Sequence, residues 1–262
     1  MRKLLLGTTA LAAATAMSAS AIADVSISGG YEFSYESYSS QTASKDGTSF
    51  TQGDTDLILN FTNKTDSGLT LSYRYDFTGA IGDTGTQTVD ENSLAISGGF
   101  GKIVLGQDDD AADSYNIDEM DLPTEEPGTT LTSATIGTSS SISSSDAMKV
   151  AYHLPAMGGF SAGVSFADSG TNTGTDKTSM GAQYSMTAGG AAITLGYATQ
   201  TTEAPTKDTD QTNMGLNVVS GDLSLIVSQG STEAVDEDID NEGASISYKM
   251  PNGMTVAAYT FK

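Results

Sequence analysis

The sequence contains no cysteine and no tryptophan, and its only histidine is His153. The absence of cysteine excludes disulfides, thiolate metal sites and cysteine nucleophiles. A single histidine excludes a multi-histidine zinc site, and a Ser-His-Asp triad would have to use His153. Basic residues are also scarce: the chain has 11 Lys and Arg residues and 33 Asp and Glu residues, which gives a net charge of −22. Nucleic acid is therefore not an expected partner, since binding to phosphates needs a basic surface.

The N-terminus has the features of a secretory signal peptide. Arg2 and Lys3 precede an apolar stretch over residues 4–16, and Ala21-Ile22-Ala23 places small residues where a signal peptidase reads them. The apolar stretch is too short for a membrane-spanning anchor. We expect residues 1–23 to be removed. Because they carry two bases and no acids, the mature chain, residues 24–262, has a net charge of −24.

After the signal peptide, apolar and polar residues alternate with period two. In residues 69–78, for example, Leu69, Leu71 and Tyr73 are separated by Thr70 and Ser72. This period predicts strands with one apolar and one polar face. Thirteen segments show it: 25–36, 56–62, 69–78, 93–97, 102–107, 147–154, 160–167, 180–186, 191–199, 214–219, 223–229, 244–250 and 254–261. The sequence therefore predicts an all-β antiparallel fold.

Short and long connections alternate along the chain. The short ones are 63–68, 98–101, 155–159, 187–190, 221–222 and 251–253, and the long ones are 39–55, 79–92, 108–146, 168–178, 200–212 and 230–243. This rhythm is typical of outer-membrane barrels, which have tight periplasmic turns and long external loops. The polar second face favours a barrel wide enough to hold water. Two alternatives remain: a secreted acidic β-sandwich or surface-layer protein, and a barrel with a structural or adhesive role.

Four motifs resemble those of a known family. They are Asp24-Val25-Ser26-Ile27-Ser28-Gly29, Thr65-Asp66-Ser67-Gly68-Leu69, Ser97-Gly98-Gly99-Phe100-Gly101-Lys102-Ile103-Val104-Leu105-Gly106 and Tyr152-His153-Leu154-Pro155-Ala156-Met157-Gly158-Gly159-Phe160-Ser161. Their order and spacing resemble the general diffusion porins of Gram-negative outer membranes. The resemblance implies a homotrimer surrounded by outer-membrane lipid and lipopolysaccharide. It also implies passive diffusion of small hydrophilic solutes and ions, without a cofactor.

The resemblance further implies that residues 108–146 are the third loop, which folds into the lumen and narrows it. This loop has acids and no base: Asp108, Asp109, Asp110, Asp113, Asp118, Glu119, Asp121, Glu125, Glu126 and Asp146. In the expected register, Arg74, Lys102 and Lys149 face inward from the wall, and His153 is a further candidate. Because acids outnumber these bases, the channel is expected to prefer cations.

The sequence departs from the family in two respects. It has thirteen predicted strands where the family has sixteen, and it ends in Phe261-Lys262 where the family ends in an aromatic residue. We therefore expect the sequence to stop before a closing strand. The alternative is an unrecognised strand within residues 129–143, where the Gly, Ser and Thr content favours a loop. The acidic run over residues 236–242 lacks the glycine and the final glutamate of an EF-hand, so no metal site is predicted. The carboxylates form no catalytic pattern, so an enzyme is not expected.

Overall fold

The computed structural model describes residues 24–38, 47–78, 88–117, 142, 147–168, 175–235 and 237–262. The predicted signal peptide lies outside this range. The thirteen predicted strands are confirmed. They are β1 (Asp24–Tyr38), β2 (Gly47–Lys64), β3 (Thr70–Thr78), β4 (Thr88–Gly98), β5 (Gly101–Gln107), β6 (Met148–His153), β7 (Phe160–Ala167), β8 (Lys177–Ala188), β9 (Ala191–Thr202), β10 (Thr209–Ser220), β11 (Leu223–Ala234), β12 (Glu237–Lys249) and β13 (Thr255–Phe261).

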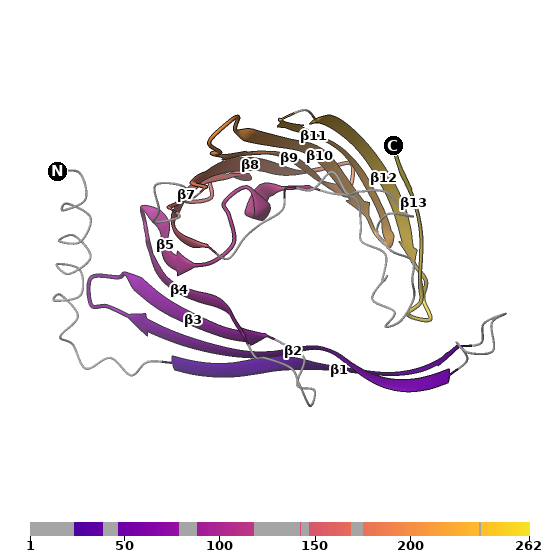
Figure 1. The fold of residues 1–262 in the computed structure, drawn as a ribbon, viewed down its shortest axis with the longest axis horizontal. Coiled ribbons are helices and arrows are strands. Elements are labelled where there is room, and N and C mark those ends of the chain that lie inside the picture. Colours follow the sequence, from indigo (N-terminus) through magenta and orange to yellow (C-terminus); the bar gives the residue numbers. More distant parts are fainter. Residues whose placement is uncertain are drawn as a thin grey trace.

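The strands form one sheet in sequence order, each antiparallel to the next. The sheet curves strongly, so that it has a convex and a concave face (Figure 1). A single sheet contradicts the β-sandwich alternative, which needs two sheets packed face to face. In the part of the chain that the structure describes, no helix is long and apolar enough to cross a membrane.

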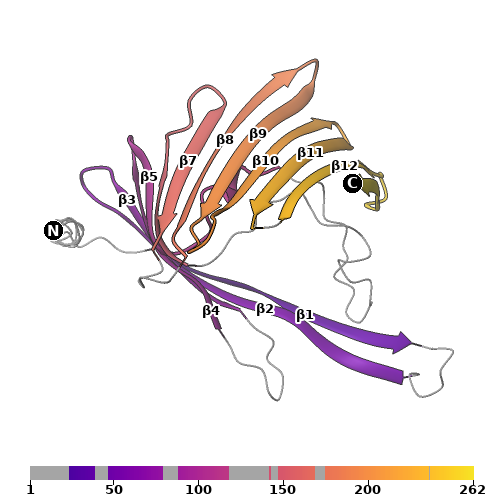
Figure 2. The same cartoon turned by 45° about the horizontal axis from the view of Figure 1, so that its top comes forward.

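The sheet is open, because β1 and β13 are its two edges and the described pairings do not join them. Figure 2 shows the β1–β2 hairpin projecting away from β12 and β13. We predicted an antiparallel barrel that lacks a closing strand, and the sheet of thirteen strands is not closed. With antiparallel neighbours throughout, β1 and β13 run in the same direction, so they could not form an antiparallel closing pair.

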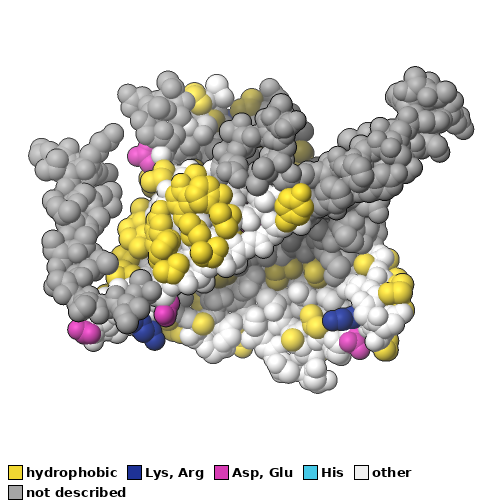
Figure 3. Space-filling view, turned by 90° about the horizontal axis from the view of Figure 1, so that it is seen from below, with side chains coloured by type: hydrophobic (Ala, Val, Ile, Leu, Met, Phe, Trp, Pro, Cys, Tyr) yellow, Lys and Arg dark blue, Asp and Glu magenta, His cyan; other side chains and the backbone are white. Residues whose placement is uncertain are grey.

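Apolar side chains cover the convex face, as the period-two pattern predicted. In β9, Leu195 and Tyr197 are 46% and 49% exposed, whereas Ala198 and Gln200 on the concave face are 0% and 1% exposed. Figure 3 shows hydrophobic side chains gathered over the sheet, with charged side chains at the margin of the cluster. The described residues form no large apolar core on the concave side. The convex face is therefore the one suited to contact lipid.

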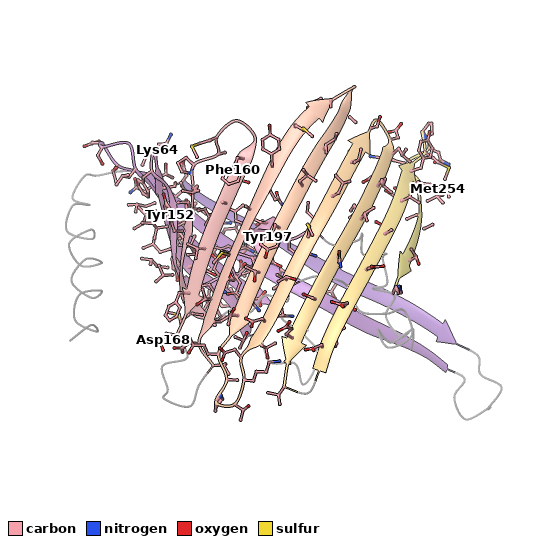
Figure 4. The ribbon with its side chains drawn as sticks, turned by 90° about the horizontal axis from the view of Figure 1, so that it is seen from above. Lys64, Tyr152, Phe160, Asp168, Tyr197 and Met254 are labelled. Atoms are coloured by element: carbon pink, nitrogen blue, oxygen red, sulfur yellow. The ribbon has the colours of Figure 1, made fainter. Side chains whose placement is uncertain are left out.

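The short turns lie at one end of the sheet. Figure 4 places Lys64, Phe160 and Met254, which flank three of these turns, at the same end, and Asp168 at the opposite end. Glycines with positive φ close several of them, including Gly221 (φ 59°) between β10 and β11. Glycine adopts this backbone conformation without a steric cost.

Several strands extend beyond their predicted ends. Residues 230–243 were predicted as a loop, but β11 continues to Ala234 and β12 begins at Glu237. Residues 200–212 and 39–55 were also predicted as loops, and strands occupy part of both. The extensions are mostly polar, as in the pair Ser231 and Asp240. Backbone pairing continues there without an apolar stripe, so the hydrophobic pattern could not reveal it.

Candidate functional site on the concave face

The chain leaves β5 and crosses the concave face of the sheet. Residues 108–117, which we call the inner segment, contain the short 3-10 helix η2 (Asp113–Tyr115). This helix contacts β8 and β9, and Figure 1 shows it within the arc of strands. The inner segment is the first part of the predicted third loop, so that loop begins on the concave side of the sheet.

An ion pair connects the inner segment to the wall. Lys149 Nζ in β6 donates a hydrogen bond of 2.9 Å to Asp110 Oδ1, and Lys177 Nζ in β8 lies 3.5 Å from Asp110 Oδ2. The two lysines stand on either side of Ala167 in one row of the sheet. The small Ala167 side chain leaves room for the carboxylate between them. The side chains of Lys149 and Asp110 are 0% and 2% exposed, so the pair is shielded from water.

Backbone amides of the inner segment donate to side chains of the wall. Ala111 N donates to Ser165 Oγ at 2.9 Å, and Ala112 N donates to Ser179 Oγ at 3.1 Å. These two hydroxyls are hydrogen-bonded to each other at 2.7 Å. The wall therefore supplies acceptors to amides that are buried and would otherwise lose their water partners. The Ala112 side chain packs against Ile142 and Ala198 in a small buried apolar cluster.

The end of the inner segment lies against β8, β9 and β10. Ile117 N donates to Asn213 Oδ1 at 3.2 Å, and Asn213 is fully buried. Tyr115 Oη and His153 Nδ1 are hydrogen-bonded at 2.8 Å. Burial raises the pKa of Tyr115 above its ordinary value, so the phenol stays protonated at neutral pH.

A second charged group lies on the concave face of β3 and β4. Arg74 Nη2 donates to Asp76 Oδ2 at 2.6 Å, and its Nε forms an ion pair with Glu91. The Arg74 side chain is 42% exposed, whereas those of Asp76 and Glu91 are 6% and 11% exposed. The Arg74 guanidinium is therefore ion-paired with two carboxylates of the wall itself, Asp76 in β3 and Glu91 in β4.

The structure brings only some of the predicted residues together. Lys149 and His153 contact the inner segment, at Asp110 and Tyr115. Arg74 forms its ion pairs with Asp76 and Glu91 of the wall. Lys102 is exposed where β5 begins and pairs in register with His153.

The predicted acids of the loop fall into two groups. Asp110 is buried, Asp108 is half-buried, and Asp109 and Asp113 are exposed. The remaining predicted acids lie outside the described residues: Asp118, Glu119, Asp121, Glu125, Glu126 and Asp146. The described residues include no group of three or more His, Asp or Glu side chains arranged to hold a metal ion.

Two kinds of residue in this site were not predicted. Lys177 was assigned to the connection 168–178, but it is the first residue of β8 and faces inward to Asp110. Gly163, Gly181, Gly196 and Gly215 lie on the concave face where Tyr115 and Ile117 approach the sheet. Glycine within a strand often marks a close backbone approach, and that signal was present in the sequence.

The convex apolar face, the polar concave face and the gathered short turns define an outer-membrane β-barrel protein. A family model described as Gram-negative porin matches residues 7–262. The chain therefore belongs to the Gram-negative porin family, whose members lie in the outer membrane and form diffusion channels. The outer-membrane localisation predicted from the sequence is confirmed, and so is the resemblance to porins.

Solved structures share the fold. An anion-selective porin from Comamonas acidovorans has a TM-score of 0.61 and 20% identity, over 92% of this chain and 78% of that chain. A porin refined at 1.8 Å has a TM-score of 0.59 and 19% identity, over 91% of this chain and 83% of that chain. Comparison with curated proteins finds no match.

Proposed function

We propose that this porin forms a water-filled channel for passive diffusion of small hydrophilic solutes and ions, narrowed by residues 108–146 and selective for cations. The observation that carries the proposal is the ion pair of Asp110 with Lys149, which fixes the acidic segment to the concave face. In a segment held there, the exposed side chains Asp109, Asp113 and Ser114 face away from the wall, toward the space that solutes would cross.

The charge balance of the concave face supports cation preference. Arg74 is paired with Asp76 and Glu91, and Lys149 and Lys177 share Asp110. These three bases are matched by the three carboxylates that they contact, and the other nine acids of residues 108–146 outnumber the remaining inward base, exposed Lys102. Clustered acids concentrate cations at a constriction. The anion selectivity in the name of the C. acidovorans porin belongs to that protein, because selectivity depends on the side chains that line each channel.

The same proposal includes the assembly and surroundings of the chain. We propose export through the signal peptide of residues 1–23, assembly as a homotrimer, and contact of the convex face with outer-membrane lipid and lipopolysaccharide. The exposed apolar side chains of that face, such as Leu195 and Tyr197, support contact with acyl chains or with another subunit. The channel requires no cofactor and performs no catalysis.

Conductance in planar lipid bilayers tests the proposal. The full-length protein, folded in detergent and checked by its heat-modifiable gel mobility, should insert and produce discrete conductance steps. Unheated gels should show a trimeric species that heating converts to single chains. Folded protein that inserts without conductance would overturn the channel proposal and favour a structural or adhesive barrel. A folded species with the mass of one chain would overturn only the trimer.

A further inference from the structure

Four consecutive strands carry a glycine on the concave face: Gly163 in β7, Gly181 in β8, Gly196 in β9 and Gly215 in β10. Gly163 pairs with Gly181, and Gly196 pairs with Gly215. None of the four has a positive φ, so backbone conformation does not require glycine at these positions. Glycine within a strand weakens it. We call these residues the glycine seat, because the inner segment lies directly on them.

Side chains at the seat would collide with the inner segment. A Cβ at Gly181 would lie 2.7 Å from Tyr115 Cβ, and a Cβ at Gly163 would lie 2.7 Å from His153 Nδ1 of the wall and 2.9 Å from Tyr115 Cε2. A Cβ at Gly196 would lie 2.7 Å from the Tyr115 carbonyl oxygen, and one at Gly215 would overlap Ile117. Non-bonded carbon atoms pack at about 3.5–4.0 Å. The inner segment can therefore occupy this position only because four side chains are absent.

The polar contacts depend on the same close approach. The hydrogen bonds from Ala111, Ala112 and Ile117 to Ser165, Ser179 and Asn213 measure 2.9, 3.1 and 3.2 Å. Lifting the segment by about 1.5 Å, the length of a C–C bond, would take these contacts beyond hydrogen-bonding distance.

We infer that the glycine seat sets how far residues 108–117 project from the wall, and thereby the width of the channel at this level. This inference rests on the proposed function, in which the segment narrows the channel. Gly163, Gly181, Gly196 and Gly215 are positioning residues: they bind no solute, but their missing side chains determine where Tyr115 and Ile117 lie. Asp110 and the wall hydroxyls then hold the segment in that position.

Cysteine labelling tests the inference, because the native chain has no cysteine. Ala112→Cys places a reporter at a position that is 0% exposed, and Ser114→Cys places one at an exposed position in the same segment. Each reporter is introduced into the otherwise native full-length chain and into Gly181→Ala, Gly196→Ala and Gly30→Ala. Gly30→Ala is the matched strand control, since its Cβ would meet only Asp56 Oδ2, at 3.9 Å. The probe is a water-soluble methanethiosulfonate, applied to folded protein.

We expect the reporter at position 112, in the native background and in Gly30→Ala, to react much more slowly than the reporter at position 114. Gly181→Ala and Gly196→Ala should accelerate labelling at position 112 by about tenfold or more, which corresponds to about 1.4 kcal/mol in the seating equilibrium. Both should also change the single-channel conductance. If either glycine variant does not fold, Tyr115→Ala and Ile117→Ala weaken the seating from the other side, because they remove contacts between the segment and the wall and leave the wall unaltered. They should also accelerate labelling at position 112.

Equal labelling rates for positions 112 and 114 in the native background would overturn the inference, because the segment would then not be seated. Unchanged labelling in folded Gly181→Ala and Gly196→Ala would overturn it as well. A protected reporter in a protein that does not conduct would leave the seat in place and contradict the proposed channel instead. Accelerated labelling with unchanged conductance would overturn the statement that the seat sets the channel width.

Discussion

Asp110 and Lys149 form a buried ion pair at 2.9 Å between the inner segment and strand β6. The pair joins residues that are 39 positions apart, and Lys177 approaches the second carboxylate oxygen from β8. One carboxylate therefore links the acidic segment to two strands of the wall.

Replacing Asp110 should destabilise the protein. Asp110→Asn removes the carboxylate from two lysines, and breaking a buried ion pair from one side costs about 3–5 kcal/mol. Urea unfolding in lipid vesicles measures the change. Asp109→Asn is the control, because Asp109 is exposed and surface substitutions usually change stability by about 0.5 kcal/mol or less. Equal effects of the two variants would contradict the structural role of Asp110.

A charge on the convex face should be costly at mid-strand and tolerated near the strand end. Leu195 lies on the convex face in the middle of β9. Leu195→Arg should cost about 2–4 kcal/mol, whereas Ser220→Arg at the end of β10 should cost about 0–1 kcal/mol. Urea unfolding in vesicles of the same lipid provides both values. A similar cost at both positions would mean that this face does not contact the hydrocarbon core.

Three carboxylates stand side by side where β10, β11 and β12 extend beyond their predicted ends: Asp210, Glu233 and Asp238. Like charges directly opposite on neighbouring strands destabilise a sheet. Glu233→Lys converts two repulsive pairs into attractive ones, so it should stabilise the protein by about 0.2–1 kcal/mol per pair. The gain should shrink at high salt. Asp222→Lys, with the same charge change at a short turn, is the control and should give no such gain.

Tyr115 should make stability depend on alkaline pH. Its pKa in the folded protein is raised by burial above the ordinary value of 10.0. Well below pH 10 the phenol is protonated in both the folded and the unfolded chain. As the pH rises through about 10, the unfolded chain loses the Tyr115 proton before the folded chain does, so the free energy of unfolding falls. The difference in unfolding free energy between the native protein and Tyr115→Phe, measured from about pH 8 to about pH 11, should narrow above about pH 10. A constant difference would contradict the burial of the phenol.

The strands and their two faces could be predicted because lipid and water impose opposite demands on alternate residues. The alternation over residues 191–199 predicted a strand with one apolar face, and its Leu195 and Tyr197 are exposed on the convex face. Where both faces are polar this contrast disappears. The pairing of Ser231 with Asp240 and of Gly230 with Asn241 was therefore missed.

The candidate site was only partly predictable for a different reason. The inward position of Lys149 follows from the period of β6, and its partner Asp110 belongs to the acidic segment. The function of Gly181 depends instead on where Tyr115 lies, and that position is set by contacts far along the chain. A strand glycine signals a close approach without identifying the approaching residue. Lys177 was missed because the start of β8 carries no apolar residue that would mark it as strand.

The reversal potential across a bilayer separating two KCl concentrations tests the central claim most directly. The proposed channel should show potassium preference at low salt, decreasing as salt rises, because screening acts over about 8 Å at physiological ionic strength. The Asp109→Asn, Asp113→Asn double variant should reduce that preference while the channel still conducts. A potential with the sign of chloride preference at low salt, from properly folded protein, would contradict the account.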